Sequence, residues 1–167
     1  RRMGDYIVSD QGKDIDEVIV SLLLNKKLTL AMAESCTGGK LASALIKHPG
    51  TSEVIDSSLV TYSNASKMRL LDVKPETLQV YGAVSHQTCS EMVKGAVKHS
   101  NADIGISITG IAGPTGGTDE KPVGLVYIGL SIFGEVYTFE NKFTGDRELI
   151  QQRAVIKALK LLYDYLK

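Results

Sequence analysis

Cysteine, histidine and net charge are scarce in this chain. Its 167 residues include two cysteines, Cys36 and Cys89, and three histidines, and its 19 basic residues balance 19 acidic ones. Two cysteines form neither a disulfide framework nor a C-x-x-C metal pair, and three scattered histidines do not make a zinc site. A balanced charge gives no attraction to a nucleic-acid backbone or an anionic membrane. We therefore expect no metal, no cofactor, no nucleic-acid partner and no membrane partner.

Long apolar runs and a secretion signal are also missing. No apolar stretch approaches the roughly 18 residues that a membrane helix needs, and no basic start precedes an apolar segment. These absences predict a cytoplasmic protein. The length suits one domain with a sizeable core. Residues 1–13 are predicted to be a lead-in or linker, and residues 14–167 to form the domain.

Helical and strand-like patterns alternate along the chain. Apolar residues recur at helical spacing from Ile15, with Asp14 as the cap, and helices are also predicted at 38–47, 64–71, 85–99 and 145–166. Strands are predicted at 28–33, 58–63 and 102–110, followed by a hairpin of 123–133 and 135–143 that turns at Gly134. The early alternation predicts parallel strands with helices on both faces, and the hairpin adds an antiparallel strand. The expected fold class is α/β, a three-layer α/β/α sandwich with a mixed, mostly parallel sheet.

The stretch AESCTGG joins the predicted strand 28–33 to a helix that begins near Gly38. Such a turn lies at the carboxyl edge of the sheet, where ligands collect in open α/β folds. Free N–H groups at the helix start attract an anion, and Gly38 and Gly39 let it approach the backbone. Ser35 is then a candidate nucleophile that faces the pocket. An ordinary helix cap by Ser35 or Thr37 explains the same residues equally well.

The stretch TYSNASK places Tyr62, Asn64 and Lys67 where a strand enters a helix. A serine hydroxyl is a weak nucleophile unless a base takes its proton, and none of the histidines lies in a glycine-flanked loop after a strand. A lysine whose pKa is lowered by burial can act as that base, and a tyrosine hydroxyl can relay the proton or stabilise an oxyanion. Asn64 is expected to cap the helix. The alternative is that Lys67 is an ordinary solvated charge.

The stretch TGIAGPTGGT, residues 109–118, is rich in glycine and follows a predicted strand. Successive N–H groups in such a loop can form an anion-binding nest. The alternative is a tight turn, in which Pro114 fixes its own φ and restricts Gly113. Two glycine-bearing loops, each after a strand, together favour a phosphorylated ligand.

With GAVS at 82–85, KPVGLVYIGL and GDRELI, these stretches resemble the carboxy-terminal domain of CinA, the competence/damage-inducible protein family, which also occurs alone as PncC-type enzymes. The resemblance covers about residues 14–166. It implies an α/β/α domain that hydrolyses nicotinamide mononucleotide to nicotinate mononucleotide and ammonia, within pyridine-nucleotide recycling. It also implies that Ser35 is the nucleophile and that Tyr62 and Lys67 activate it. The lead-in resembles the segment that joins this domain to an amino-terminal half in longer CinA proteins.

The resemblance and the loops together suggest how a substrate binds. Backbone N–H groups near Cys36 to Gly38 are expected to donate to the oxyanion, and the 109–113 segment to cradle the ribose phosphate with Arg147 or Arg153 as its charged partner. The expected substrate-binding residues are Cys36, Thr37, Gly38, Gly39, Asn64, Thr109, Gly110, Ile111, Ala112, Gly113 and Arg147.

Two other functions stay open at the level of sequence. In the first alternative, the chain is a non-catalytic nucleotide-binding or regulatory module of a larger CinA-type protein. In the second, the chain is a thiol amidase with Cys36 as its nucleophile, since a helix start can lower the pKa of a thiol. We further expect a homodimer.

Overall fold

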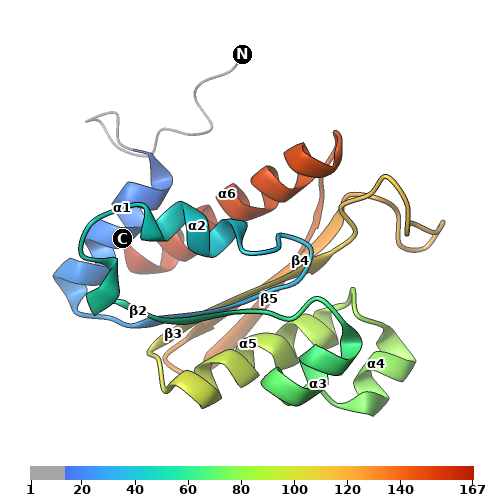
Figure 1. The fold of residues 1–167 in the computed structure, drawn as a ribbon, viewed down its shortest axis with the longest axis horizontal. Helices are drawn as coiled ribbons and strands as arrows, with labels where there is room; N and C mark the ends of the chain where they lie inside the picture. Colours follow the sequence, from blue (N-terminus) through green and yellow to red (C-terminus); the bar gives the residue numbers. More distant parts are fainter. Residues whose placement is uncertain (1–13) are drawn as a thin grey trace.

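Helices and strands alternate through residues 14–167, the part of the chain that the computed structural model describes (Figure 1). The expected lead-in, residues 1–13, lies outside the described residues. The strands are β1 (Leu30–Glu34), β2 (Ile55–Val60), β3 (Ile104–Gly110), β4 (Leu125–Ile132) and β5 (Glu135–Lys142). The helices are α1 (Ile15–Lys26), α2 (Lys40–Ile46), α3 (Asn64–Leu71), α4 (Pro75–Tyr81), α5 (His86–Ser100) and α6 (Arg147–Leu166), with a 3₁₀ turn at Thr51–Glu53. No helix within residues 14–167 is long and apolar enough to cross a membrane.

The five strands form one mixed sheet in the order β2-β1-β3-β4-β5. Strand β1 pairs in parallel with β2 and β3, whereas β4 runs antiparallel to both β3 and β5. Four of the five strands therefore point the same way, which confirms the predicted mixed, mostly parallel sheet. Because β1, β2 and β3 are parallel, their carboxyl ends meet at one edge, where the loops that follow them lie together.

Helices cover both faces of the sheet, so the three-layer prediction is also confirmed. Helices α1, α2 and α6 pack on one face, and α3, α4 and α5 on the other (Figure 1). Strand β1 is buried along its whole length, with Leu30 and Met32 in the core under α2 and α6, and Ala31 and Ala33 in the core under α5.

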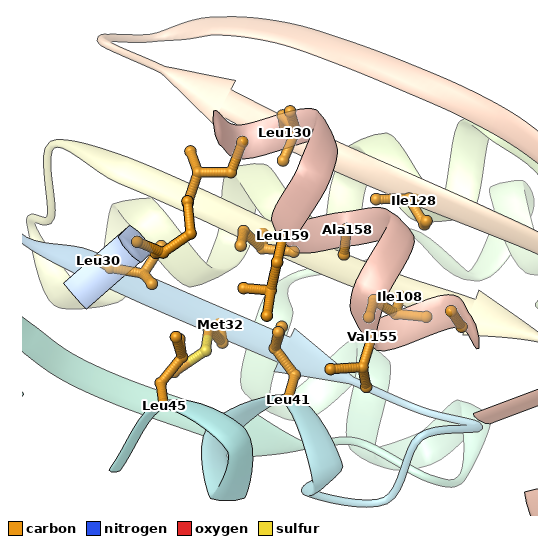
Figure 2. Close-up of a cluster of buried hydrophobic side chains, with 14 of the residues drawn as sticks. Leu30, Met32, Leu41, Leu45, Ile108, Ile128, Leu130, Val155, Ala158 and Leu159 are labelled. Carbon is orange, nitrogen blue, oxygen red and sulfur yellow. The ribbon is translucent and has the colours of Figure 1, made fainter. Parts of the chain in front are cut away.

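The larger core lies between the sheet and helices α2 and α6. Figure 2 shows β-strand side chains meeting residues of both helices there, and all of them are buried. Burial of each leucine or isoleucine side chain stabilises the fold by about 1.5–3 kcal/mol, so this core anchors the β1 strand that leads to Ser35. The labelled residues are Leu30, Met32, Leu41, Leu45, Ile108, Ile128, Leu130, Val155, Ala158 and Leu159.

Two predicted boundaries and one predicted cap need correction. Strand β2 begins at Ile55 and ends at Val60, so the prediction of 58–63 was wrong for its last three residues. Helix α2 starts at Lys40 rather than near Gly38, because Gly38 and Gly39 adopt positive φ angles of 57° and 96° that a right-handed helix does not contain. The cap of α3 is Ser63, which forms a capping box with Ser66, and Asn64 is the first helical residue. The predicted cap of α5 is confirmed, since Ser85 accepts a hydrogen bond from the Thr88 N–H.

Candidate active site

Ser35 is the first residue after β1, and neighbouring strands fix its backbone from both sides. Its N–H donates to the Ile108 carbonyl of β3 at 2.9 Å, while the Thr61 N–H donates to the Glu34 carbonyl at 2.8 Å. Side chains alternate between the two faces of a strand, so Ser35 continues the side of Ala31 and Ala33, toward α3 and α5. Only 8% of Ser35 is exposed.

Lys67 of α3 lies beside Ser35. The Lys67 Nζ is 3.0 Å from Ser35 Oγ, 2.8 Å from the Thr61 carbonyl oxygen and 3.5 Å from the Tyr62 carbonyl oxygen. Lys67 is 1% exposed, and none of the ion pairs among the described residues includes it. The alternative of a solvated surface lysine is therefore wrong.

The surroundings of Lys67 favour its neutral amine. Burial lowers the pKa of Lys67 below its ordinary value, because the ammonium loses hydration. A neutral amine has two N–H donors and one lone pair. As an ammonium, Lys67 donates to Ser35 Oγ as well as to the two carbonyls. As a neutral amine it can donate to the Thr61 and Tyr62 carbonyls, and its lone pair can then accept from the Ser35 hydroxyl. The arrangement can thus remove a proton from Ser35.

A cavity of about 340 Å³ opens in front of this pair. Two stretches predicted as ligand loops reach it, together with Tyr62 and Arg147. The lining residues are Ser35, Cys36, Tyr62, Lys67, Ala83, Val84, Thr109, Gly110, Ile111, Ala112, Gly113, Thr115, Gly116 and Arg147. Of the residues expected at the site, Thr37, Gly38, Gly39 and Asn64 do not line the cavity.

The start of helix α2 is closed to a ligand, contrary to the expectation from Gly38 and Gly39. The Glu34 carboxylate accepts hydrogen bonds from the backbone N–H groups of Gly39, Leu41 and Ala42, at 3.0–3.1 Å. It also accepts one from the Thr37 hydroxyl at 2.7 Å. The first-turn donors that would attract an anion are therefore already satisfied within the protein. Sequence reasoning missed Glu34, although it stands beside Ser35 in the AESCTGG stretch.

Tyr62 and Arg147 meet at the cavity. One guanidinium nitrogen of Arg147 donates to the Tyr62 hydroxyl at 2.9 Å and another to the Gly113 carbonyl at 2.8 Å. Tyr62 is 63% exposed, and its hydroxyl makes no hydrogen bond to Ser35 or Lys67 among the described contacts. Arg153, the other arginine considered for phosphate, instead donates to Thr144 and does not line the cavity.

Residues of the loop after β3 line the cavity, and several of their backbone N–H groups are not used within the described residues. Within residues 14–167, the N–H groups of Ala112, Gly113, Thr115 and Gly116 have no hydrogen-bond acceptor. The Thr109 hydroxyl does not face outward as a donor to a ligand, because it donates to the Ala83 carbonyl at 2.8 Å. That bond draws the 82–85 turn to the site, so the GAVS stretch was the signal for the missed Ala83 and Val84.

Cys36 is poorly suited to act as the nucleophile. Burial raises the pKa of the Cys36 thiol to about 12, and the Glu34 charge adds to this effect. The thiolate, which is the reactive form, is therefore scarce at neutral pH.

The histidines lie outside the candidate active site. His48 pairs with Asp16 and His99 with Asp72, and none of the three histidines lines the cavity. No group of three or more His, Cys, Asp or Glu side chains suited to a metal ion occurs among the residues described.

Comparison with known proteins places this chain in a family. The sequence profile of the CinA C-terminal domain matches residues 12–166. The chain is 50% identical over 161 residues to a competence-damage inducible protein of Clostridium novyi, covering 96% of this chain and 39% of that protein. It is 54% identical over 154 residues to the protein of that name in Clostridium acetobutylicum, covering 92% of this chain and 38% of the relative. The chain thus spans about two fifths of the length of these relatives.

Solved structures share the fold along almost their whole length. The competence/damage inducible protein of Agrobacterium tumefaciens superposes with a TM-score of 0.89 at 39% identity, covering 92% of this chain and 94% of that one. A CinA superfamily protein of Escherichia coli gives a TM-score of 0.87 at 38% identity, with 95% and 93% of the two chains covered. On sequence and fold together, this chain belongs to the CinA C-terminal domain family.

Proposed function

We propose that this protein hydrolyses the carboxamide of nicotinamide mononucleotide to give nicotinate mononucleotide and ammonia. The observation that supports this proposal most strongly is the position of Lys67. Its side chain is buried and forms no ion pair with an acid among the described residues, and its Nζ lies 3.0 Å from Ser35 Oγ at a cavity. A nucleophile and a base at hydrogen-bond distance are the minimum for acyl transfer by a serine. The choice of substrate rests on the resemblance of the surrounding stretches to the CinA and PncC-type enzymes.

The first half of the reaction acylates Ser35. The Ser35 oxygen attacks the carboxamide carbon while its proton passes to the Lys67 amine. The tetrahedral oxyanion accepts a hydrogen bond from a backbone N–H group, for which the donor of Cys36 lines the cavity and is free among the described residues. The Lys67 ammonium then protonates the leaving nitrogen, the carbon–nitrogen bond breaks, and ammonia departs.

The second half returns the enzyme to its starting state. Lys67, neutral again, takes a proton from water, and the hydroxide attacks the acyl carbon. The carbon–oxygen bond to Ser35 breaks, and the proton on Lys67 returns to the Ser35 oxygen. Because Ser35 and Lys67 meet directly, no relay through the Tyr62 hydroxyl is required, and Tyr62 contributes its carbonyl to Lys67 and its hydroxyl to Arg147.

We assign the phosphate of the substrate to the part of the cavity that Arg147 and the 112–116 segment line. Arg147 carries a charge with no acidic partner in residues 14–167, and the 112–116 loop adds unpaired N–H groups. Cationic and backbone donors of this kind are the usual partners of a phosphate. A cavity of 340 Å³ lies within the range of small-molecule sites, roughly 300–1,000 Å³.

An ammonia-release assay tests the proposal. Purified protein is incubated with nicotinamide mononucleotide, and both ammonia and nicotinate mononucleotide are quantified. We expect turnover by the wild type, and none above background for Ser35→Ala, whose binding of the substrate in calorimetry stays close to wild type. A folded wild type that binds the nucleotide without releasing ammonia would instead support the non-catalytic binding module.

A further inference from the structure

Glu34 is a fully buried carboxylate directly before the nucleophile, and it has no cationic partner among the described residues. It is 0% exposed, and the ion pairs within residues 14–167 do not include it. A buried carboxylate without compensation is strongly destabilising, so its environment must supply donors. Because burying this carboxylate costs free energy, and because it stands next to Ser35, we ask what it contributes to the site.

An obvious role for an acid beside a serine and a lysine is to pair with the lysine, and the fold excludes it. Glu34 shares its side of β1 with Leu30 and Met32, which pack under α2 and α6. Lys67 comes from α3, on the other face of the sheet (Figure 1). The carboxylate and the amine are thus separated by the strand itself, which leaves Lys67 without a negative partner that would favour its charged form.

The Glu34 carboxylate instead holds the turn that follows Ser35. One oxygen accepts from the Thr37 hydroxyl and from the N–H groups of Gly39 and Leu41, and the other accepts from the Ala42 N–H. Ser58 of β2 lies 3.5 Å from the second oxygen. These contacts tie the end of β1 to the first turn of α2, so the segment 35–39 between them has both ends fixed by one side chain.

The turn held in this way leaves two N–H groups free beside the nucleophile. Within 35–39, the Gly38 N–H donates to the Ser35 carbonyl and Gly39 to Glu34, whereas Cys36 and Thr37 have no acceptor among the described residues. The Cys36 carbonyl accepts a hydrogen bond of 2.7 Å from Gln151 of α6. Because the C=O and N–H of a trans peptide point in opposite directions, the Thr37 N–H is aimed away from α6.

We propose that Glu34 is a positioning residue of the reaction: by holding the 35–39 turn against α2 it places the Ser35 hydroxyl on Lys67 and keeps the N–H of Cys36, which lines the cavity, available to the oxyanion. This inference rests on the proposed function of Ser35. A carboxylate is required rather than an amide, since all four close partners are donors and a carboxylate accepts with both oxygens. A glutamine would turn an NH₂ group toward donors.

The test compares Glu34→Gln with Glu76→Gln, which removes an exposed carboxylate from the first turn of α4, away from the cavity. We expect Glu34→Gln to lower kcat by about 10²-fold, as misplacement of reacting groups by about 1 Å does, with KM within about threefold of wild type. The pH at which kcat/KM rises should stay unchanged, because the carboxylate does not face Lys67. Glu76→Gln should leave all three quantities at wild-type values.

Thr37→Val supplies a second, milder variant that keeps the carboxylate. It removes the hydroxyl that donates to Glu34 and leaves the Thr37 N–H in place. We expect kcat to fall in the same direction by about tenfold, the loss of one hydrogen bond to a charged group. This variant decides the matter if Glu34→Gln does not fold.

The outcomes distinguish a positioning role of Glu34 from a purely structural or an electrostatic one. Wild-type kcat in folded Glu34→Gln and Thr37→Val, with reduced thermal stability alone, would overturn the inference and leave Glu34 as an ordinary helix cap. A shift of the kcat/KM rise to lower pH in Glu34→Gln would overturn it too, because it would make Glu34 an electrostatic partner of Lys67.

If the wild type releases no ammonia, the proposed function is wrong, and the role of Glu34 needs a separate test. The burst of p-nitrophenolate from p-nitrophenyl acetate then reports acetylation of Ser35, with Ser35→Ala as the blank. Glu34→Gln should slow that burst by about 10²-fold. An unchanged burst, or a wild type whose Ser35 is not acetylated, would overturn the inference.

Discussion

Replacing Gly95 by alanine tests whether the placement of Lys67 sets the rate. Gly95 lies in α5 under the end of α3, and a Cβ built there stands 2.0 Å from the carbonyl oxygen of Leu71. Ordinary contact begins at 3.4 Å, so that oxygen must retreat by about 1.4 Å. Leu71 is one helical turn after Lys67, and a retreat of the helix therefore moves the amine away from Ser35.

Helix α3 is the element that yields. Helix α5 buries six residues against the sheet and its neighbours, whereas α3 buries only Lys67 and Leu71. Overpacking costs about 1–3 kcal/mol, and the better helix propensity of alanine offsets about 1 kcal/mol of it. The free energy of unfolding should thus fall by at most about 2 kcal/mol, and the domain stays folded. The rate should fall more, by about 10²-fold for a misplacement of about 1 Å.

The assay measures kcat for ammonia release and the urea midpoint of the same preparation. Lys94→Ala is the matched control, since Lys94 is the exposed neighbour of Gly95 in the same helix and meets no part of α3 in the hydrogen bonds and ion pairs described. We expect its kcat to equal that of the wild type. A folded Gly95→Ala protein with wild-type kcat would refute the idea that the position of α3 controls the chemistry.

Three further predictions concern the cavity. Burial lowers the folded pKa of Lys67, so the unfolded chain binds more protons between that pKa and the ordinary value of 10.5. The wild type should therefore gain stability relative to Lys67→Met as pH rises through this window, and urea unfolding at about pH 7 and about pH 10 measures the change. Arg147→Ala should raise KM for nicotinamide mononucleotide by about 10- to 100-fold, the loss of a charge-assisted hydrogen bond, and leave KM for the riboside, which has no phosphate, unchanged. Cys36→Ser should retain ammonia release within about tenfold, since burial raises the pKa of Cys36 to about 12 and keeps the thiol protonated; loss of turnover would make Cys36 the nucleophile.

The layers of the fold could be predicted from the sequence, because the hydrophobic periodicity and the glycine and proline residues that end helices and strands indicated the same elements. Alternating helices and strands gave the α/β/α sandwich, and Gly134 marked the β4–β5 turn correctly. The predicted position of strand β2 was too late in the chain, because Ile55 to Ser57 follow a 3₁₀ turn that no residue pattern indicated. Ser63 and Asn64 are both good cap residues, and the choice between them depends on the Ser66 partner three residues after Ser63.

The site was harder to predict, because its chemistry depends on contacts between distant segments. Nothing local distinguishes Lys67 from a solvated lysine, and only the packing of α3 on α5 brings its side chain, buried, to Ser35 at the end of β1. Gly38 and Gly39 suggested a free helix start, but Glu34 on the preceding strand occupies it. A buried carboxylate at a strand end has no sequence signature of its own. The Thr109 to Ala83 bond likewise joins loops that the sequence separates by 26 residues.

The most direct test of the account is the rate of ammonia release by wild type and Lys67→Met, measured from about pH 6 to about pH 10. We predict that wild-type kcat/KM rises with pH to a plateau, with a midpoint below 10.5, as the buried amine loses its proton. Lys67→Met should show no turnover above background at any pH. A flat wild-type profile, or a Lys67→Met enzyme within tenfold of the wild-type rate, would contradict these predictions.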